Sequence, residues 1–421
     1  MSTTASAIAA VETQLRLSIS QLEMIRARET RQPGDKPRGH TKKRKRKKLA
    51  TAEDSTVDDP CEDTAAAKTS PDTVTTAAGS AAAEAAPEAA ATEAHTRQVR
   101  MRRRDATTGA AGAAAADPEA TQRTGSCLVT LCGHKSWVNS VSFSPDGSRI
   151  LTVSADKTCK LWNAIDGSYL RTLAGHTLKV NSASFSPNGR RIVTSSYDKT
   201  AQLRIASNGA HSRTLTGHRL NVWFATFSPD GVRILTGSED KTAKVWSGLD
   251  GSLELTLTGH ISAVRCASFS PDGSRIITGS RDKTAKLWNA IDGSLQQTLT
   301  GHTLGVFYAS FSPDGSCILT GSNDKKIKLW SAKHGSLQWT RSCHKYPVLS
   351  TSFSPDGTSI LTASSGQFAR LRRAVNGSCE LTIAGHTLGV NSASFSPDGS
   401  HIVTSSYDET AKLWSAVDGS L

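Results

Sequence analysis

From residue 125 onwards the chain consists of short segments in which apolar and polar residues alternate or β-branched residues predominate. In the first group, Val138 to Ser144 and Arg149 to Ser154 are separated by a Pro-Asp-Gly turn, and Thr158 to Trp162 and Ser168 to Leu173 are separated by an Asp-Gly turn. Proline presets one turn dihedral, and glycine accepts the positive φ that a tight turn requires. The pattern predicts four short strands per group, joined by hairpins.

The same group occurs seven times with a constant spacing. A Gly-His pair occurs at His134, His176, His218, His260, His302 and His386, and Cys343-His344 fills the remaining position, so that the period is 42 residues. Seven phenylalanines keep this spacing, and each precedes Ser-Pro-Asp-Gly or, once, Ser-Pro-Asn-Gly: Phe143, Phe185, Phe227, Phe269, Phe311, Phe353 and Phe395. Such regularity predicts a repeat protein in which each copy is one structural unit.

Residues 1–124 have a different composition. From Leu49 to Thr124 the chain is dominated by Ala, Thr, Ser, Glu and Asp, which provide too little apolar surface to offset the entropy of the chain, so this arm is predicted to be disordered. One short helix over about residues 6–29 is predicted by apolar residues at steps of three or four, and it could dock a partner or self-associate. Those residues are Val11, Leu15, Ile19, Leu22 and Ile25.

Seven consecutive cations follow in the same arm: Lys42, Lys43, Arg44, Lys45, Arg46, Lys47 and Lys48. The run resembles a one-part nuclear import signal, which implies an import receptor as a partner and a nuclear location. Attraction to nucleic acid or to an anionic membrane, and a plain solvated charge run, are the alternatives. Without import, the chain would be cytoplasmic.

Most of the basic charge lies outside this arm. The chain has a formal net charge of +13, and residues 1–124 hold 20 Lys and Arg against 17 Asp and Glu, so residues 125–421 contribute +10. Because these cations recur in every copy, they would spread around the molecule. Nonspecific attraction to nucleic acid is therefore not favoured, since no channel with aromatic stacking positions is evident.

The cysteine spacing and the hydropathy of the chain indicate which compartment and which cofactors to expect. The eight cysteines (Cys61, Cys127, Cys132, Cys159, Cys266, Cys317, Cys343 and Cys379) show no paired spacing of the kind that a zinc site needs. No run reaches the roughly 18 to 20 apolar residues that span a bilayer, and no apolar signal core is present. We expect a soluble intracellular protein with no metal, no cofactor and no membrane partner.

The order Gly-His, Ser-Pro-Asp-Gly, Asp-Lys-Thr and Leu-Trp resembles the WD-repeat family over Gly125 to Leu421, with Trp-Asp loosened to Trp-Asn or Trp-Ser. The resemblance implies an all-β fold, a seven-bladed β-propeller with four antiparallel strands per blade. The segment Cys127 to Leu131 precedes the first Gly-His and has no blade of its own. It is expected to complete the last blade, which removes the open edge of the ring.

The family also implies a buried hydrogen-bonded chain in each blade: Trp162, Ser154, His134 and Asp156 in the first copy. An indole only donates, a hydroxyl relays, an imidazole does both, and a carboxylate terminates the chain. The equivalent residues are His218, Ser238, Asp240 and Trp246; His260, Ser280, Asp282 and Trp288; His302, Ser322, Asp324 and Trp330; and His386, Ser406, Asp408 and Trp414.

Two copies depart from this pattern. Arg204 and Arg372 stand at the Trp position of the second and sixth copies, and the sixth also has Gly366 for the Asp. These are either decayed blades or places where a guanidinium replaces the indole to serve a partner or an adjacent acidic group. The Ser, His and Asp types also occur in catalytic triads, but a nucleophile is needed once, whereas this trio recurs with the repeat. We therefore expect no enzyme.

Three positions per copy vary in chemistry while their neighbours stay constant, and in the family these lie on the narrow top face, where peptides dock. They give a candidate partner site, rich in the residue types that dominate interfaces: Trp137, Asn139, Lys179, Tyr197, Trp223, Glu239, Arg265, Arg281, Phe307 and Tyr407. Alternatively, Trp223 and Phe307 pack between blades or plug the channel, and the cations Lys179, Arg265 and Arg281 are merely solvated.

These features favour a protein-interaction scaffold that captures peptide segments of partners, as a subunit of a nuclear complex. Two alternatives remain. One is a nucleic-acid-associated factor in RNA processing or ribosome assembly, and the other is a cytoplasmic or cytoskeletal signalling adaptor.

Overall fold

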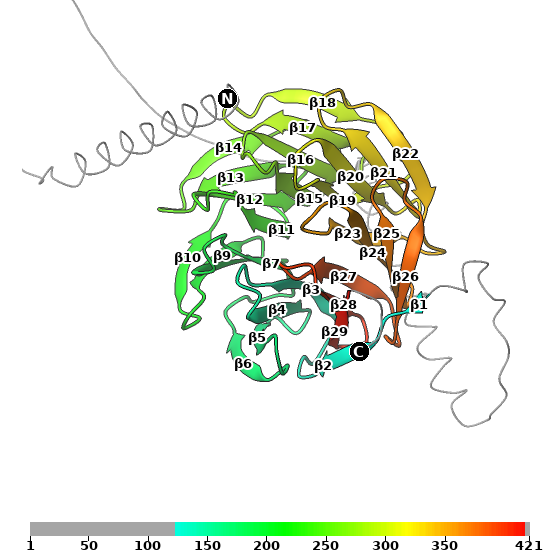
Figure 1. Cartoon of the computed structure of the whole chain (residues 1–421). Coiled ribbons are helices and arrows are strands. Elements are labelled where there is room, and N and C mark those ends of the chain that lie inside the picture. Colours follow the sequence, from blue (N-terminus) through cyan, green and yellow to red (C-terminus); the bar gives the residue numbers. More distant parts are fainter. Residues whose placement is uncertain (1–122, 417–421) are drawn as a thin grey trace, which may run out of the picture. The chain divides into compact units, whose positions relative to one another are not determined.

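The computed structural model describes residues 123–416, which contain twenty-nine strands and no helix. The strands form seven sheets arranged as a ring of blades, with one strand of each sheet at the central channel (Figure 1). The predicted arm up to residue 122, its helix over 6–29 and its basic run 42–48 lie outside the described residues.

Each of the first five blades is a meander of four antiparallel strands in chain order. The first four blades comprise β3 (Val138–Phe143), β4 (Arg149–Ser154), β5 (Cys159–Asn163) and β6 (Tyr169–Leu173); β7 (Val180–Phe185), β8 (Arg191–Ser196), β9 (Ala201–Ile205) and β10 (His211–Leu215); β11 (Val222–Phe227), β12 (Arg233–Ser238), β13 (Ala243–Ser247) and β14 (Leu253–Leu257); and β15 (Val264–Phe269), β16 (Arg275–Ser280), β17 (Ala285–Asn289) and β18 (Leu295–Leu299).

The sixth and seventh blades also include strands from the start of the described chain. Blades five to seven comprise β19 (Val306–Phe311), β20 (Cys317–Ser322), β21 (Lys326–Ser331) and β22 (Leu337–Ser342); β23 (Val348–Phe353), β24 (Ser359–Ser364), β25 (Phe368–Arg373) and β26 (Cys379–Ala384); and β27 (Val390–Phe395), β28 (His401–Ser406) and β29 (Ala411–Ser415), with β1 (Arg123–Thr124) and β2 (Cys127–Leu131) added at the edges. The propeller of seven blades with four antiparallel strands each, which the resemblance to the WD-repeat family implies, is confirmed.

The Ser-Pro-Asp-Gly sequence forms the hairpin between the first two strands of a blade. In blade one, Ser144 Oγ donates to Asp146 Oδ1 at 2.5 Å, and the Arg149 N–H donates back to Ser144 Oγ at 2.9 Å. Gly147 has φ of 71°, a region in which a residue with a Cβ is strained. The turn is therefore held by local bonds before any blade packs against it.

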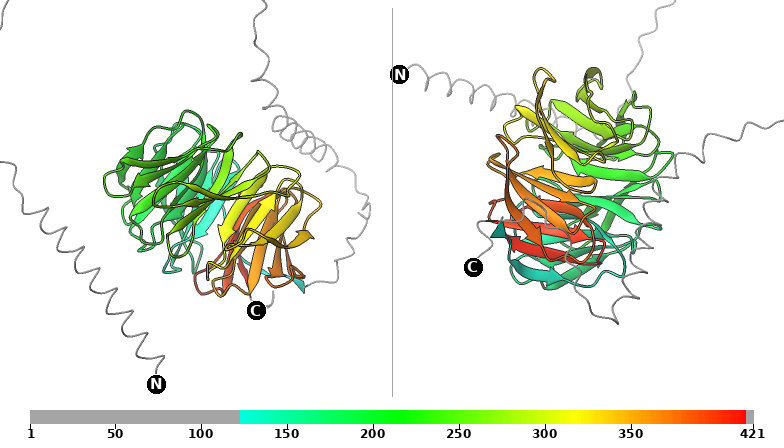
Figure 2. Two further views of the ribbon diagram at one scale, coloured as in Figure 1. Left: turned by 90° about the horizontal axis from the view of Figure 1, so that it is seen from above. Right: turned by 90° about the vertical axis from the view of Figure 1, so that its right-hand side faces the viewer.

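The hydrophobic core lies between neighbouring blades, because the sheets stand side by side around the ring, as the further views confirm (Figure 2). One cluster joins Val193 and Leu203 of blade two to Ala225, Phe227 and Trp246 of blade three. Each blade thus buries its two faces against two neighbours, and a ring without a gap buries every face.

The chain closes its own ring. β2 pairs antiparallel with β29, with Val129 opposite Leu413 and Leu131 opposite Ala411, so that the seventh blade combines the start and the end of the described chain (Figure 1). Leu131 is only 2% exposed and packs in the cluster that joins blades seven and one. The strand supplies both the missing hydrogen bonds and part of that core.

One strand of the fold is not predicted by the repeat. β1 pairs in parallel with β26, with Thr124 opposite Thr382, and the Gly125 N–H donates to Thr382 O at 3.1 Å. The propeller thus begins two residues before the expected boundary at Gly125. Residues 123–131 form a strap that lies along the outer edge of blade six and then completes blade seven.

The buried chain in each regular blade runs through a threonine. In blade one the Trp162 indole donates to Thr152 Oγ1 at 2.8 Å, His134 Nε2 lies 2.8 Å from the same hydroxyl, and His134 Nδ1 lies 2.8 Å from Asp156 Oδ2. Equivalent contacts occur in blades three, four, five and seven, at Thr236, Thr278, Thr320 and Thr404. The indole, the hydroxyl, the imidazole and the carboxylate therefore satisfy one another.

The prediction that a serine hydroxyl belongs to this hydrogen-bonded chain is wrong. Ser154 Oγ donates to Ser136 O at 3.0 Å and accepts from the Asp156 N–H at 3.0 Å. The same correction applies to Ser238, Ser280, Ser322 and Ser406, whose hydroxyls bond backbone groups near the turn. These serines stabilise the turn that contains the aspartate, and they do not bond the indole.

The turn aspartates are held as carboxylates. Burial by itself would raise the pKa of Asp198, but hydrogen bonds from His176 and Thr200 outweigh it, and the pKa falls to about 2. The pKa of Asp324 falls to about 2 through the same balance, with His302 as the main opposing partner. Such carboxylates stabilise the fold above their ordinary pKa of about 3.9, and this contribution is lost as the pH falls toward 2.

Blades two and six replace the indole by a buried guanidinium. Arg204 is 5% exposed and donates to Ala174 O and to Gln202 Oε1, and Arg372 is 2% exposed and donates to Cys343 O at 2.9 Å and Gly377 O at 3.1 Å. Both side chains bond carbonyl groups of their own blade. The partner role considered for these two arginines is therefore not supported.

Removal of the strap tests ring closure. A chain that lacks residues 1–131 should melt at a lower temperature than one that lacks residues 1–122, because the first loses the β2 hydrogen bonds and the burial of Leu131, and Leu131→Ala alone should cost about 2–5 kcal/mol. Thermal unfolding of both truncations measures this. Equal melting temperatures would contradict closure by β2.

A double-mutant cycle distinguishes the two hydroxyls of blade three. Thr236→Val combined with Trp246→Phe should show a coupling free energy of roughly 1 kcal/mol, because one hydrogen bond joins the pair. Ser238→Ala with Trp246→Phe is the control and should be additive within about 0.5 kcal/mol. Urea unfolding of the single and double variants gives both values, and a larger coupling for Ser238 would restore the serine to the chain.

Candidate functional site

Two of the three variable positions lie in two loops of each blade that backbone bonds hold together, and the third, five residues after the histidine, lies in the first strand, as Trp223 does in β11. The Tyr197 N–H donates to Lys179 O at 3.0 Å, and the Arg281 N–H donates to Ala263 O at 2.9 Å. These loops precede the first strand and join the second strand to the third. The position three after the histidine and the position before the turn aspartate are therefore neighbours in every blade.

Four blades contribute to one continuous stack, which we call the cation–aromatic ladder: Lys179, Tyr197, Trp223, Arg265 and Phe307. Lys179 Nζ lies 3.5 Å from the Tyr197 ring centroid, and that ring meets Trp223 edge-to-face at 4.9 Å. Arg265 Cζ lies 3.4 Å from the Trp223 centroid and 4.8 Å from that of Phe307. The ladder joins blades two, three, four and five.

Arg281 flanks the ladder, and two further pairs lie outside it. Arg281 Cζ is 5.9 Å from the Trp223 centroid. Trp137 of blade one meets Tyr407 of blade seven edge-to-face at 5.1 Å. Glu239 Oε2 accepts from Asn221 Nδ2 at 2.6 Å within blade three. The predicted residues, apart from Asn139, thus form one extended group and two small ones instead of a single continuous site.

Asn139 has a role in joining blades. Its Nδ2 donates to Val180 O of blade two at 2.8 Å. Asn181 and Asn391 occupy the same repeat position and donate to Val222 O and Val138 O. The equivalent positions in blades three to five hold Trp223, Arg265 and Phe307, so one position joins the blades by an amide in one part of the ring and by the ladder in another. The recurrence of asparagine at this repeat position in three blades could have indicated a structural role from the sequence alone.

The ladder side chains are half-buried. Trp223 contacts blades two and four, so it packs between blades, as the alternative interpretation expects. A cation over an aromatic face contributes about 0.5–1 kcal/mol when exposed and about 2 kcal/mol when desolvated. A ligand that covers the ladder would desolvate these contacts, so packing between blades and partner binding are compatible there.

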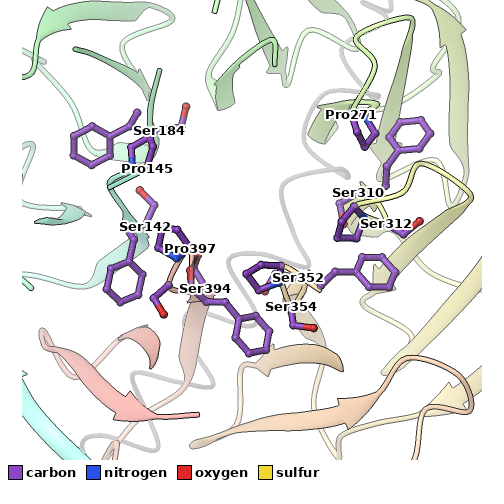
Figure 3. A pocket seen from close by; sticks show the side chains of 18 of the residues that line it. Ser142, Pro145, Ser184, Pro271, Ser310, Ser312, Ser352, Ser354, Ser394 and Pro397 are labelled. Carbon is purple, nitrogen blue, oxygen red and sulfur yellow. Dashed lines mark hydrogen bonds between the residues drawn. The ribbon is translucent and has the colours of Figure 1, made fainter. Parts of the chain in front are cut away.

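The channel at the opposite face has a different lining. A cavity of about 490 Å³ is lined by the repeated Ser-Phe-Ser-Pro segments, whose serines and prolines surround an open centre (Figure 3). Apart from Tyr308, its lining consists of serines, phenylalanines and prolines. Within the described residues, this lining holds no carboxylate, imidazole or amine that could act as a general acid or base.

Neither a metal site nor a membrane-spanning helix is present in residues 123–416. No group of three or more His, Cys, Asp or Glu residues in this range is arranged to hold a metal ion. No helix in the same range could cross a bilayer.

The family model described as WD domain, G-beta repeat matches seven segments of the chain: residues 125–163, 167–203, 209–247, 251–289, 293–331, 335–371 and 377–415. Each match starts near the outer strand of one blade and ends with the third strand of the next. Together the matches cover well over half of the chain.

Curated relatives match over the length of a single repeat. Lissencephaly-1 homolog 1 of Paramecium tetraurelia is 59% identical over 39 residues, which are 9% of this chain and 10% of the relative. Nuclear distribution protein nudF of Aspergillus flavus is 51% identical over 39 residues, 9% of each chain, and nudF 2 of Penicillium rubens is 49% identical over 39 residues, 9% of this chain and 8% of the relative.

The matched stretch thus spans about a tenth of each curated relative. A match of this length shows similarity to one blade, whereas the seven family matches extend over the whole ring. The chain therefore belongs to the WD-repeat family.

Proposed function

We propose that this chain is a non-enzymatic protein-interaction scaffold that binds extended peptide segments of partner proteins over the cation–aromatic ladder. The observation that supports the proposal most is the ladder itself, in which Trp223 and Arg265 stack at 3.4 Å across two blades. Trp, Tyr and Arg side chains dominate the binding energy of protein interfaces. A ring of packed sheets presents them with little loss of conformational entropy on binding.

Charge indicates the kind of segment. Lys179, Arg265 and Arg281 belong to or flank the ladder, and Glu239 is the acidic residue of the predicted set. The excess of positive charge favours a peptide that carries carboxylates, and such charges raise the association rate more than the final affinity.

The matched relatives affect the choice of compartment. Two of them are named nuclear distribution proteins, a name that does not state membership of a nuclear complex. We therefore place the alternative of a cytoplasmic or cytoskeletal adaptor before the nuclear one. The basic run 42–48 keeps import through an import receptor as a hypothesis that a fluorescent fusion with and without the run would test.

The ladder predicts which substitutions reduce partner binding without unfolding. Arg265→Ala and Lys179→Ala should each lower the affinity for a partner that the full chain captures. For Arg265→Ala we expect a loss of about thirtyfold or more, because truncating an interface anchor costs about 2 kcal/mol. Both variants should still fold, with stability lowered by about 1–2 kcal/mol because each loses cation–π contacts. Trp288→Ala should instead lower stability by roughly 3–5 kcal/mol, because its indole is buried.

Arg213→Ala is the matched control, since Arg213 is an exposed cation on an outer strand. Affinity and melting temperature are measured for all four variants. If Arg265→Ala and Lys179→Ala bound every captured partner as the unaltered chain does, the ladder would not be the binding surface.

A further inference from the structure

An arginine on the second strand of four blades inserts into the next blade at the bottom face. Arg149, Arg191, Arg233 and Arg275 each donate to two backbone carbonyls of the following blade, at positions that advance by 42 residues. We call each of these an arginine clasp. The four clasps join blades one to five.

The four clasps share the same set of partners. Arg233 Nη1 lies 2.6 Å from Ala290 O, its Nη2 lies 3.2 Å from Gly273 O, and its Cζ is 5.3 Å from the Phe269 ring centroid. In the other clasps the guanidinium carbon lies 5.3–5.5 Å from the equivalent ring. Two carbonyls and one aromatic face therefore form a receptor that suits a planar guanidinium.

The receptor between blades five and six lacks its arginine. The repeat places Cys317 at the position of Arg275, and Gly357, Ala374 and Phe353 at the positions of the two carbonyls and the ring. Cys317 Sγ donates instead to Gln338 Oε1 at 3.6 Å. Between residues 123 and 416, no hydrogen bond reaches the carbonyl oxygen of Gly357 or of Ala374.

A cavity occupies this place. It has a volume of about 910 Å³, and its lining includes Cys317, Phe353, Gly357 and Ala374, all the elements of the clasp receptor. It also reaches Leu329 in the core of blade five. Between blades one and two, by contrast, the corresponding hollow is lined by Arg149 itself.

The charge around the cavity suits a cation. Asp314, Asp356 and Glu380 line it, and Arg373 is the one cation of its lining and pairs with Glu380. Hydrogen bonds from Ser312 and Ser316 lower the pKa of Asp314 to about 2, so this carboxylate is charged at neutral pH.

We propose that this cavity binds the arginine side chain of a partner polypeptide, whose guanidinium takes the place that Arg275 takes one blade earlier. The bound group would donate to Gly357 O and Ala374 O and lie over the Phe353 ring, while the acidic rim attracts the partner. The site lies at the bottom face, and it does not depend on the ladder.

The test uses the full chain and the peptide acetyl-Gly-Arg-Gly-amide. Because Cys317 lines the cavity, the bound peptide should slow its alkylation by iodoacetamide, and mass spectrometry of the fragment that contains Cys317 measures this saturable protection. The same peptide with citrulline in place of arginine keeps the shape of the side chain without its charge. It should protect Cys317 from alkylation about tenfold less or not at all. Protection by citrulline equal to that by arginine would overturn the proposal.

Two variants separate binding from folding. Cys317→Arg supplies the missing clasp and should raise the melting temperature while it weakens peptide binding in titration calorimetry about tenfold or more. Cys317→Ser, the matched control, keeps the cavity open and should bind as the unaltered chain does. Unchanged binding by Cys317→Arg, the absence of saturable protection in the unaltered chain, or equal binding of a lysine peptide would each overturn the proposal.

Discussion

The threonine hydroxyl at the centre of each regular blade is the group on which the ring depends. It is fully buried and joins a side chain that can only donate, the indole, to an imidazole that passes the bond on to a carboxylate. An unsatisfied buried polar group costs about 1–3 kcal/mol. The loss of one member therefore lowers the stability of the fold, because it leaves its buried neighbour without a hydrogen-bond partner. The pattern of Trp, Thr, His and Asp follows from this requirement, and each member belongs to a different strand or loop of the blade.

The blades are joined in different ways around the ring. Asparagine amides join blades seven, one, two and three at the top, the ladder joins blades two to five, and arginine clasps join blades one to five at the bottom. Blades five to seven have Cys317, Ser359 and His401 at the clasp position. The strap of residues 123–131 lies along blade six and completes blade seven, and so supports part of the ring that lacks clasps. The less regular part of the ring is also where an open receptor can be tolerated.

The period of 42 residues was sufficient to predict seven copies with four strands in each, and the resemblance to the WD-repeat family implied the ring and its closing strand. The period was not sufficient to choose between Thr152 and Ser154. Both hydroxyls repeat with the same period, and they lie two residues apart on one face of a strand, so only the distance to the indole separates them. The two-residue strand β1 is too short to leave a pattern.

The candidate site was predictable as a set of positions but not as an arrangement. Comparison of the copies identified Trp223 and Arg265 as variable, yet their contact depends on side-chain directions across a blade boundary that the sequence does not specify. The open clasp receptor, in contrast, can be found in the sequence once the role of Arg149 is known, because the series of four arginines ends where Cys317 takes the next repeat position.

Hydrogen exchange of the indole N–H groups tests the central claim most directly. In the full chain, the indole protons of Trp162, Trp246, Trp288, Trp330 and Trp414 should exchange only through global unfolding, with the denaturant dependence of the whole propeller, because each donates to a buried threonine. Exchange of any of the five at the rate of a free indole would contradict the account.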